Sequence, residues 1–343
     1  MFKISCGQGI FPLSMKTDFQ QLARSHPTFE AIAANDVLFG EDRERVGYTP
    51  SPGEVLDLVD EAFECHENSH GDAAWTMMVQ NILRLSLRTL GAAQLNHLAN
   101  FMPCPTAATV CEYLPAASSS DTVDFCMYME PNADADPMFE RSSSIPGSPA
   151  LRRVRRQLPG GALNHTTYYP LRNRPIALGI RTRKSSEGWK GASVHWGSWE
   201  LAHWNFLRCL ASIVPAAEQN EEEYETEPVI KEEEEEEEEE QHEVAQTLPS
   251  PRVVRPPLPP FIPGIIIEKH NWYLSVSTEN GDEVVMGSRI MVGATNSLRG
   301  IYQIILGLQT LREWAEDMYW PIVKNLIVGA QRNQAQGGSQ LVA

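Results

Sequence analysis

The sequence contains no run of 18 apolar residues, so it predicts no transmembrane helix and no membrane partner. Its N-terminus, MFKISCGQGIFPLSMKTDF, lacks the long apolar core and the small-residue cleavage site of a secretory signal. Six cysteines are too few for a disulfide scaffold, and their spacings match no zinc pattern such as C-x2-C. These absences predict an intracellular protein, nuclear or cytoplasmic rather than secreted, with reduced thiols.

Negative charge is abundant but confined to one segment. The chain has a formal net charge of −17, and residues 218–243 alone contain 16 glutamates and one lysine. Subtracting the −15 of this segment leaves about −2 for the rest of the chain, which is close to neutral. A proline-rich stretch follows, and such a composition cannot bury enough apolar area to offset its ordering entropy. Residues 216–262 are therefore predicted to be a disordered insert. This insert is either a solvated linker or a polyanion that binds basic proteins.

The apolar content of 42% is sufficient for a globular core, and helical patterns begin near residue 50. Residues 1–48 show no sustained periodicity and are predicted to form an N-terminal arm with at most one short helix. In SPGEVLDLVDEAFECHENS, Ser51 and Glu54 form a capping box around Pro52, and apolar residues follow at helical spacing. Asp72 is a candidate cap for a second predicted helix.

Strand patterns follow in two groups, one on each side of the insert. DTVDFCMYME alternates between two faces, and RPIALGIRTR is apolar enough to be buried on both faces; a helix follows in SVHWGSWELAHWNFLRCLASIV. Beyond the insert, GIIIEKHNWYLSVSTENGDEVVMGSRIMVG predicts two strands with a hairpin at Asn280-Gly281. A long helix from about residue 296 to 327 is then kinked or broken by Pro321.

This order of elements indicates one α/β domain with a mixed sheet. The strands after the insert cannot be stable as an isolated hairpin, so they are predicted to complete the sheet that begins before it. The predicted organisation is an arm, a first half, the insert, a second half and a disordered tail, at residues 1–48, 49–215, 216–262, 263–328 and 329–343.

Four of these segments together resemble the PD-(D/E)XK nuclease-like domain found in many fungal proteins. They are VDFCMYMEP, LNHTTYYPLRNRPIALGIRTR, GIIIEKHNWYLSVST and SLRGIYQIILGLQTLREWAEDMYWP, and the resemblance spans roughly residues 50–328. It implies a restriction-endonuclease-like fold, in which helices flank a mixed central sheet. Active members place an aspartate on one strand and a Glu-x-Lys motif on its neighbour. Two carboxylates bind Mg²⁺, which activates water, and the lysine compensates the charge of the transition state.

The resemblance transfers only one acidic position to this sequence. Asp124 matches the strand aspartate, Arg181 takes the place of the glutamate, and Arg183 takes the place of the lysine. His195 lies near a position where relatives often have a glutamine, and Met78 falls where they often carry a helix glutamate. A guanidinium about 4 Å from a divalent cation would be repelled by roughly 8 kcal/mol at an effective dielectric constant near 20. We therefore expect a catalytically impaired, degenerate member with no bound cofactor.

Two other interpretations of this site remain open. In an active Mg²⁺-dependent nuclease, Asp124 and a displaced acid such as Glu200 would hold the metal ion while Arg183 contacts the phosphate. In a purely structural interpretation, Asp124 caps a loop or pairs with Arg181 or Arg183.

Basic residues and potential metal ligands occur elsewhere in the sequence. Four arginines lie in a segment predicted to be a loop, where they form either a nucleic-acid-binding patch or an ordinary basic surface: Arg152, Arg153, Arg155 and Arg156. Cys65, His66 and His70 have local spacing that suits a transition metal, although solvated side chains are the simpler interpretation. The leading hypothesis is a nearly inactive domain that binds nucleic acid or protein through Arg181, Arg183 and the four arginines. The rivals are the active nuclease and an interaction protein that acts through the acidic insert.

Overall fold

The computed structural model describes residues 1–337 except 26, 89–96, 117, 119, 141–147, 183–188, 215–255, 282 and 288. Most of the predicted insert at 216–262 and the end of the predicted tail therefore lie outside the described residues. None of the described helices is both long and apolar enough to cross a membrane.

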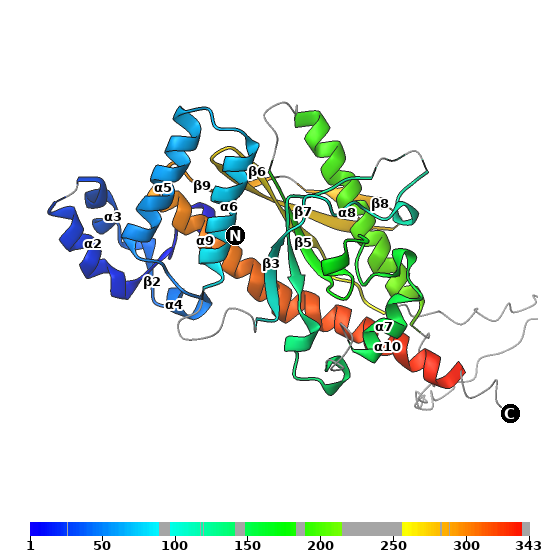
Figure 1. Ribbon diagram of the computed structural model, residues 1–343. Coiled ribbons are helices and arrows are strands. Elements are labelled where there is room, and N and C mark those ends of the chain that lie inside the picture. The colour runs from blue at the N-terminus through cyan, green and yellow to red at the C-terminus, as the bar shows by residue number, and fades with distance from the viewer. Residues whose placement is uncertain are drawn as a thin grey trace, which may run out of the picture.

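Helices flank a mixed central sheet, as the sequence predicts (Figure 1). In the described part of the chain, the strands follow the order β3-β4-β5-β6-β7-β8, and β9 also pairs with β7. The β5–β6 pair is parallel and the other pairs of this sheet are antiparallel. The strands are β3 (Ala99–Pro103), β4 (Phe125–Met129), β5 (Ile176–Thr182), β6 (Ile262–Glu268), β7 (Asn271–Asn280), β8 (Glu283–Met286) and β9 (Ile290–Ala294).

The two halves of the sequence meet at the centre of this sheet. Strand β5 precedes the insert and β6 follows it, and Ile180 pairs with Ile265 between them. The expectation that the later strands complete the earlier sheet is confirmed. The segment from β6 to β9 contains more strands than the two expected. The β6–β7 turn is formed by Lys269 and His270, and Lys269 has a φ of +52°.

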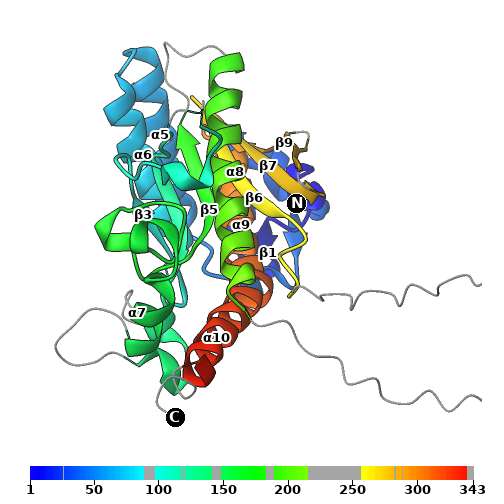
Figure 2. The same cartoon turned by 90° about the vertical axis from the view of Figure 1, so that its right-hand side faces the viewer.

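Helices cover both faces of the sheet. Figure 2 shows α8 (Trp189–Ser212) in front of β5 and β6, with α9 (Leu298–Trp314) behind them. The face under α9 also packs against α5 (Pro52–Glu67) and α6 (Asp72–Ser86), and Met78 is buried there. The capping box at Ser51 and Glu54 forms as predicted at the start of α5.

Helix α8 approaches the sheet closely because two glycines lie beneath its tryptophans. A Cβ atom on Gly264 would lie 2.1 Å from the Trp196 ring, and one on Gly179 would lie 2.7 Å from Trp199 Nε1. Both indoles are buried, with their rings against the strands. This contact fixes the first turns of α8 against β5 and β6.

The long C-terminal helix continues beyond α9 but is interrupted near Pro321, as expected. A π-helical turn, Ala315–Tyr319, separates α9 from α10 (Trp320–Gly337). Proline has no N–H group, and its ring displaces the carbonyl one turn earlier, so the regular ladder cannot pass through it.

Residues 1–48 form short elements that pack on the rest of the molecule, whereas the sequence suggested at most one short helix. Phe11 lies 4.6 Å from the Tyr302 ring of α9, and Gln303 donates to Ile4 O at 2.7 Å. The helices are α1 (Phe2–Ser5), α2 (Lys16–Ala23), α3 (Glu30–Ala33) and α4 (Arg43–Val46), and a parallel pair joins β1 (Phe11–Pro12) to β2 (Phe39–Gly40). Elements this short give too few repeats for a detectable period.

Candidate functional site

Asp124 lies immediately before β4, at the end of the sheet where β5 finishes. Its backbone N–H donates to Ile180 O at 3.1 Å, and its Oδ2 accepts from the Thr182 N–H at 2.6 Å. The half-buried carboxylate therefore caps the end of the β4–β5 pair. Asp124 therefore has a structural role, and it lies at the rim of the sheet where β5 ends.

Arg181 lies on β5, on the strand next to Asp124 and one residue beyond Ile180. Phe125 pairs with Ile180, and the Asp124 N–H also donates to the Ile180 carbonyl, so Asp124 lies beside the last residues of β5. The Arg181 guanidinium donates from Nη1 to Thr122 O at 3.1 Å, and its side chain is half-buried. A cation thus lies at the rim on the strand next to Asp124. Arg183, the second predicted cation, lies outside the described residues.

His195 reaches the same rim from α8 and meets an acid that the sequence analysis did not single out. Its Nδ1 forms a hydrogen bond with Asp121 Oδ1. The Asp121 side chain is 7% exposed, whereas that of His195 is 40% exposed. Asp121 lies three residues before Asp124, and only this D-x-x-D spacing could have suggested it.

Glu200 lies away from this rim, inside the molecule. It is fully buried and its Oε2 accepts from Ser277 Oγ at 2.6 Å. Ser277 pairs with Ile262, whereas Arg181 pairs with Ile266, so the two levels differ by about 13 Å along the strands. Burial raises the pKa of Glu200 to about 8, so the carboxyl group keeps its proton at neutral pH.

The described residues at Asp124 do not make up the donor set of a divalent cation. Mg²⁺ is normally held by carboxylates and other oxygen ligands in an octahedral arrangement. Throughout the described ranges, no three His, Cys, Asp or Glu side chains converge as a metal site requires. This includes the Cys65, His66 and His70 set, in which Cys65 is buried while both histidines are exposed.

The four arginines lie on a short helix rather than in the expected loop. Ser148 caps α7 (Pro149–Arg155), and Leu151 and Val154 anchor its apolar side. The sequence pattern was misleading because the helix is short and sits in a proline- and serine-rich stretch. Arg152, Arg153 and Arg155 belong to α7, and Arg156 is its C-cap.

The surroundings of these arginines are basic. Burial and the nearby Arg172, Arg156 and Arg152 lower the pKa of Arg155. The Arg172 guanidinium lies 5.3 Å from the ring centre of Tyr169, whose side chain is 66% exposed. This group, Arg152, Arg153, Arg155, Arg156 and Arg172, is called the α7 arginine cluster below. The cluster lies beside the start of β5 at Ile176. Thr182, at the other end of this strand, is about 20 Å away.

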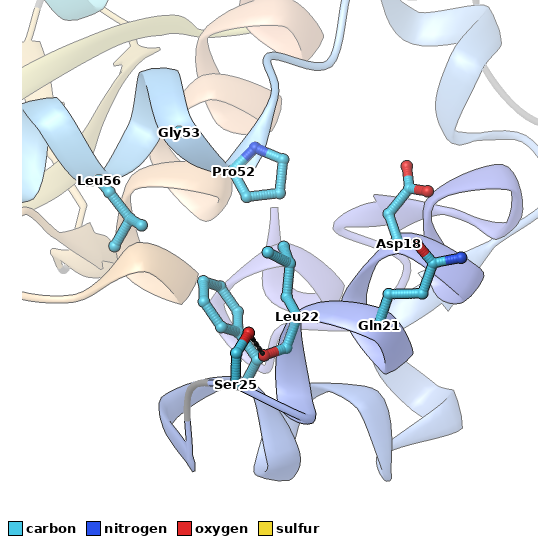
Figure 3. Close-up of a pocket in the computed structure, with 8 residues that line it drawn as sticks. Asp18, Gln21, Leu22, Ser25, Pro52, Gly53 and Leu56 are labelled. Atoms are coloured by element: carbon cyan, nitrogen blue, oxygen red, sulfur yellow. Dashed lines mark hydrogen bonds between the residues drawn. The ribbon is translucent and has the colours of Figure 1, made fainter.

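A surface pocket of about 590 Å³ lies between α2 and the start of α5 (Figure 3). Asp18 and Gln21 lie along one side of it, and Leu56 lies on the other. Its remaining lining consists of Leu22, Ser25, Phe29, Pro52 and Gly53, so none of the predicted site residues faces it.

A family model described as PD-(D/E)XK nuclease superfamily matches residues 19–320, which include both halves of the sheet and most of residues 1–48. No curated protein matches the chain, and no solved structure matches it.

Proposed function

Because this chain belongs to the PD-(D/E)XK nuclease superfamily, we propose that it binds nucleic acid through a nuclease-like domain whose metal site is degenerate. The observation that carries this proposal is the Arg181 guanidinium, which lies on the strand next to Asp124 and donates to Thr122 O, two residues before Asp124. In this position a guanidinium stands where an active site would need a ligand oxygen, and it repels a divalent cation. A guanidinium binds phosphate well, so the substitution favours binding over hydrolysis.

Two basic regions support nucleic-acid binding. The first is Arg181 at the rim of the sheet, and the second is the α7 arginine cluster at the start of β5. Backbone phosphates supply most of the affinity of such contacts, and an exposed aromatic side chain such as Tyr169 adds stacking with an unpaired base. We expect the two regions to contribute independently because about 20 Å of strand separates them.

Binding is tested by fluorescence anisotropy with single- and double-stranded DNA and RNA over a series of salt concentrations. Arg181→Ala, and a separate variant with Arg152, Arg153, Arg155 and Arg156 changed to Ala, should each weaken binding and flatten its salt dependence. Arg45→Ala is the matched control, because exposed Arg45 pairs only locally with Asp42. Equal affinity of all variants for every nucleic acid would contradict the proposal.

Catalytic impairment is tested by incubating the same nucleic acids with Mg²⁺ or Mn²⁺. We expect no metal-dependent turnover above that of Asp124→Ala. Robust turnover that disappears in Asp124→Ala would instead identify an active metal-dependent nuclease. Deleting residues 218–243 tests the acidic insert, because loss of binding to basic proteins after the deletion would assign that binding to the insert.

A further inference from the structure

The pocket between α2 and α5 contains none of the residues that carry the proposed nucleic-acid binding. Figure 1 shows α2 and α5 at one end of the molecule and α7 at the other. The pocket volume of about 590 Å³ falls within the range of about 300–1,000 Å³ that is typical of ligand sites. It is therefore large enough to receive side chains of a partner.

The floor of the pocket is apolar and is held in place by the core. Phe29 is 3% exposed, and its ring lies 5.8 Å from the ring of the fully buried Phe19. Leu22 and Leu56 reach the pocket from α2 and α5, and both are half-buried (Figure 3). Ser25 donates its hydroxyl to Leu22 O at 3.2 Å, so this polar group of the lining already has a partner. A ligand of this pocket must therefore present apolar groups to its floor.

The apolar surface continues beyond the pocket along one face of α5. The spacing of four apolar residues places them on this face, here called the outer stripe of α5: Pro52, Leu56, Val59 and Phe63. The residues that α5 buries in the core form a neighbouring stripe: Val55, Leu58, Ala62 and Cys65. Phe63 is 61% exposed, so the fold leaves the end of the outer stripe in solvent. From Pro52 to Phe63 this stripe is about 16 Å long, or roughly three helical turns.

Acidic side chains border this apolar surface. Helix α5 contains six acidic residues and no lysine or arginine. Glu54 is paired with Arg88. The exposed acidic residues of α5 that follow beside the outer stripe are Asp57, Asp60 and Glu64. On the opposite wall α2 contributes the exposed Asp18, whereas Arg24 at its C-cap does not line the pocket. The groove thus combines an apolar floor with negative edges.

This combination determines which kind of partner fits. Carboxylates at the edges repel the phosphates of a nucleic acid and attract lysine and arginine. A helix with one apolar face and basic flanks supplies both kinds of contact, and three helical turns match the length of the outer stripe. We propose that the groove between α2 and α5 binds a basic amphipathic helix of a protein partner. This binding does not depend on the nucleic-acid binding proposed above.

A designed peptide is the probe for this inference. It is a fluorescein-labelled helix of about 15 residues with leucines at i, i+3, i+4 and i+7 spacing and lysines elsewhere. Its acidic analogue has glutamate in place of every lysine. We expect the full-length protein to bind the basic peptide in fluorescence anisotropy, and to bind the acidic analogue at least about tenfold more weakly. A variant that lacks residues 218–243 is titrated in parallel, because the glutamates of that segment attract the same peptide.

Substitutions that block or neutralise the groove test where the peptide binds. A Cβ atom on Gly53, which lines the pocket, meets nothing within 4 Å, so Gly53→Tyr fills open space and leaves the core intact. It should weaken peptide binding at least about tenfold, both in the full-length chain and in the deletion variant. Phe63→Ser should weaken it about tenfold, and Asp18→Asn about two- to fivefold at low salt. Val285→Ser removes an exposed apolar side chain from β8 and is the matched control, with unchanged affinity expected.

Thermal melting establishes that each variant is folded. The inference is overturned if a folded Gly53→Tyr variant binds the basic peptide as tightly as the wild type. It is also overturned if the wild type binds neither peptide, which would leave the groove to a smaller ligand. Binding that disappears when residues 218–243 are deleted would assign the peptide site to that segment instead. A dimer that sedimentation detects and that Gly53→Tyr dissociates would assign the groove to a second copy of this chain, which again overturns the inference.

Discussion

Two histidines of α8, His195 and His203, show how position along one helix decides the role of a side chain. His195 is 40% exposed and bonded to a carboxylate. His203 is completely buried, bonds to the Tyr319 hydroxyl at 3.1 Å and stacks on His165 at 4.7 Å. Burial lowers the pKa of His203 to about 3, so this ring stays neutral.

The difference follows from what lies on each side of the helix. The first turns of α8 lie at the rim of the sheet. There, Nδ1 of His195 bonds to Asp121, and solvent reaches the His195 ring. The later turns pack between the sheet and the π-helical turn that contains Tyr319, and Tyr319 in turn donates to Ile176 O at 2.5 Å. The beginning of α8 is therefore open to solvent, whereas stability depends on its middle.

The largest expected effect concerns Glu200, which lies between the two histidines. Its pKa is about 8 in the folded protein, against 4.5 for an ordinary glutamate. Between these values the folded state binds more protons, so its contribution to stability is full below pH 4.5 and is lost as the pH rises to about 8. Relative to Glu200→Gln, the wild type should lose about 1.4 kcal/mol of unfolding free energy per pH unit in this window.

Urea unfolding of both proteins at several pH values measures this difference. The contribution of His203 has the opposite sign below pH 6.5 but cancels in the comparison, because both proteins contain it. Glu112→Gln, on the surface, is the matched control. A difference between wild type and Glu200→Gln that does not vary with pH would mean that Glu200 is ionised in the folded state.

A somewhat smaller effect is expected where α8 rests on the sheet. Gly264→Ala places a methyl group 2.1 Å from the Trp196 ring, so the start of α8 must shift. Overpacking of this kind costs about 1–3 kcal/mol, and here it should also displace His195. Gly197→Ala is the control, since a Cβ atom there meets nothing within 4 Å and alanine favours a helix. If both variants are equally stable, the tryptophan–glycine contact does not fix α8.

Removing the hydroxyl group of Tyr319 tests whether the buried contacts of His203 stabilise the fold. Tyr319→Phe leaves His203 Nε2 and the Ile176 carbonyl without this partner, and both are buried. We expect a loss of about 1–3 kcal/mol in unfolding free energy, measured by chemical denaturation. RNA binding should not change, because the cluster lies away from the rim. A change in binding without a change in stability would contradict this division of roles.

Much of the fold could be predicted because its signals are local. The capping box of α5, the buried strand β5 and the hairpin at Asn280-Gly281 depend on neighbouring residues, and all three form. The β6–β7 turn was missed because Lys269 adopts a positive φ without the glycine or asparagine that usually marks such a turn.

The candidate site could be predicted only in part, because it depends on packing. The resemblance indicated that Asp124 and Arg181 occupy neighbouring strands, and the register of β4 and β5 agrees with this. Apart from its D-x-x-D spacing with Asp124, Asp121 has no signal in the sequence, since its contact with His195 exists only after α8 docks on the sheet. In the sequence, Glu200 was the acid proposed as a displaced metal ligand for an active nuclease. Only its burial against Ser277 separates it from the rim.

The smallest expected effect concerns His195, at the exposed beginning of α8. His195→Gln should change the unfolding free energy by less than about 1 kcal/mol, because half-exposed polar pairs contribute little to stability. Thermal melting of this variant beside Tyr319→Phe measures both ends of α8 in one experiment. Removing a group that is retained for function should change the unfolding free energy little, whereas removing a buried structural group should lower it clearly. If His195→Gln proves as destabilising as Tyr319→Phe, the Asp121–His195 pair is a structural contact like the one at Tyr319.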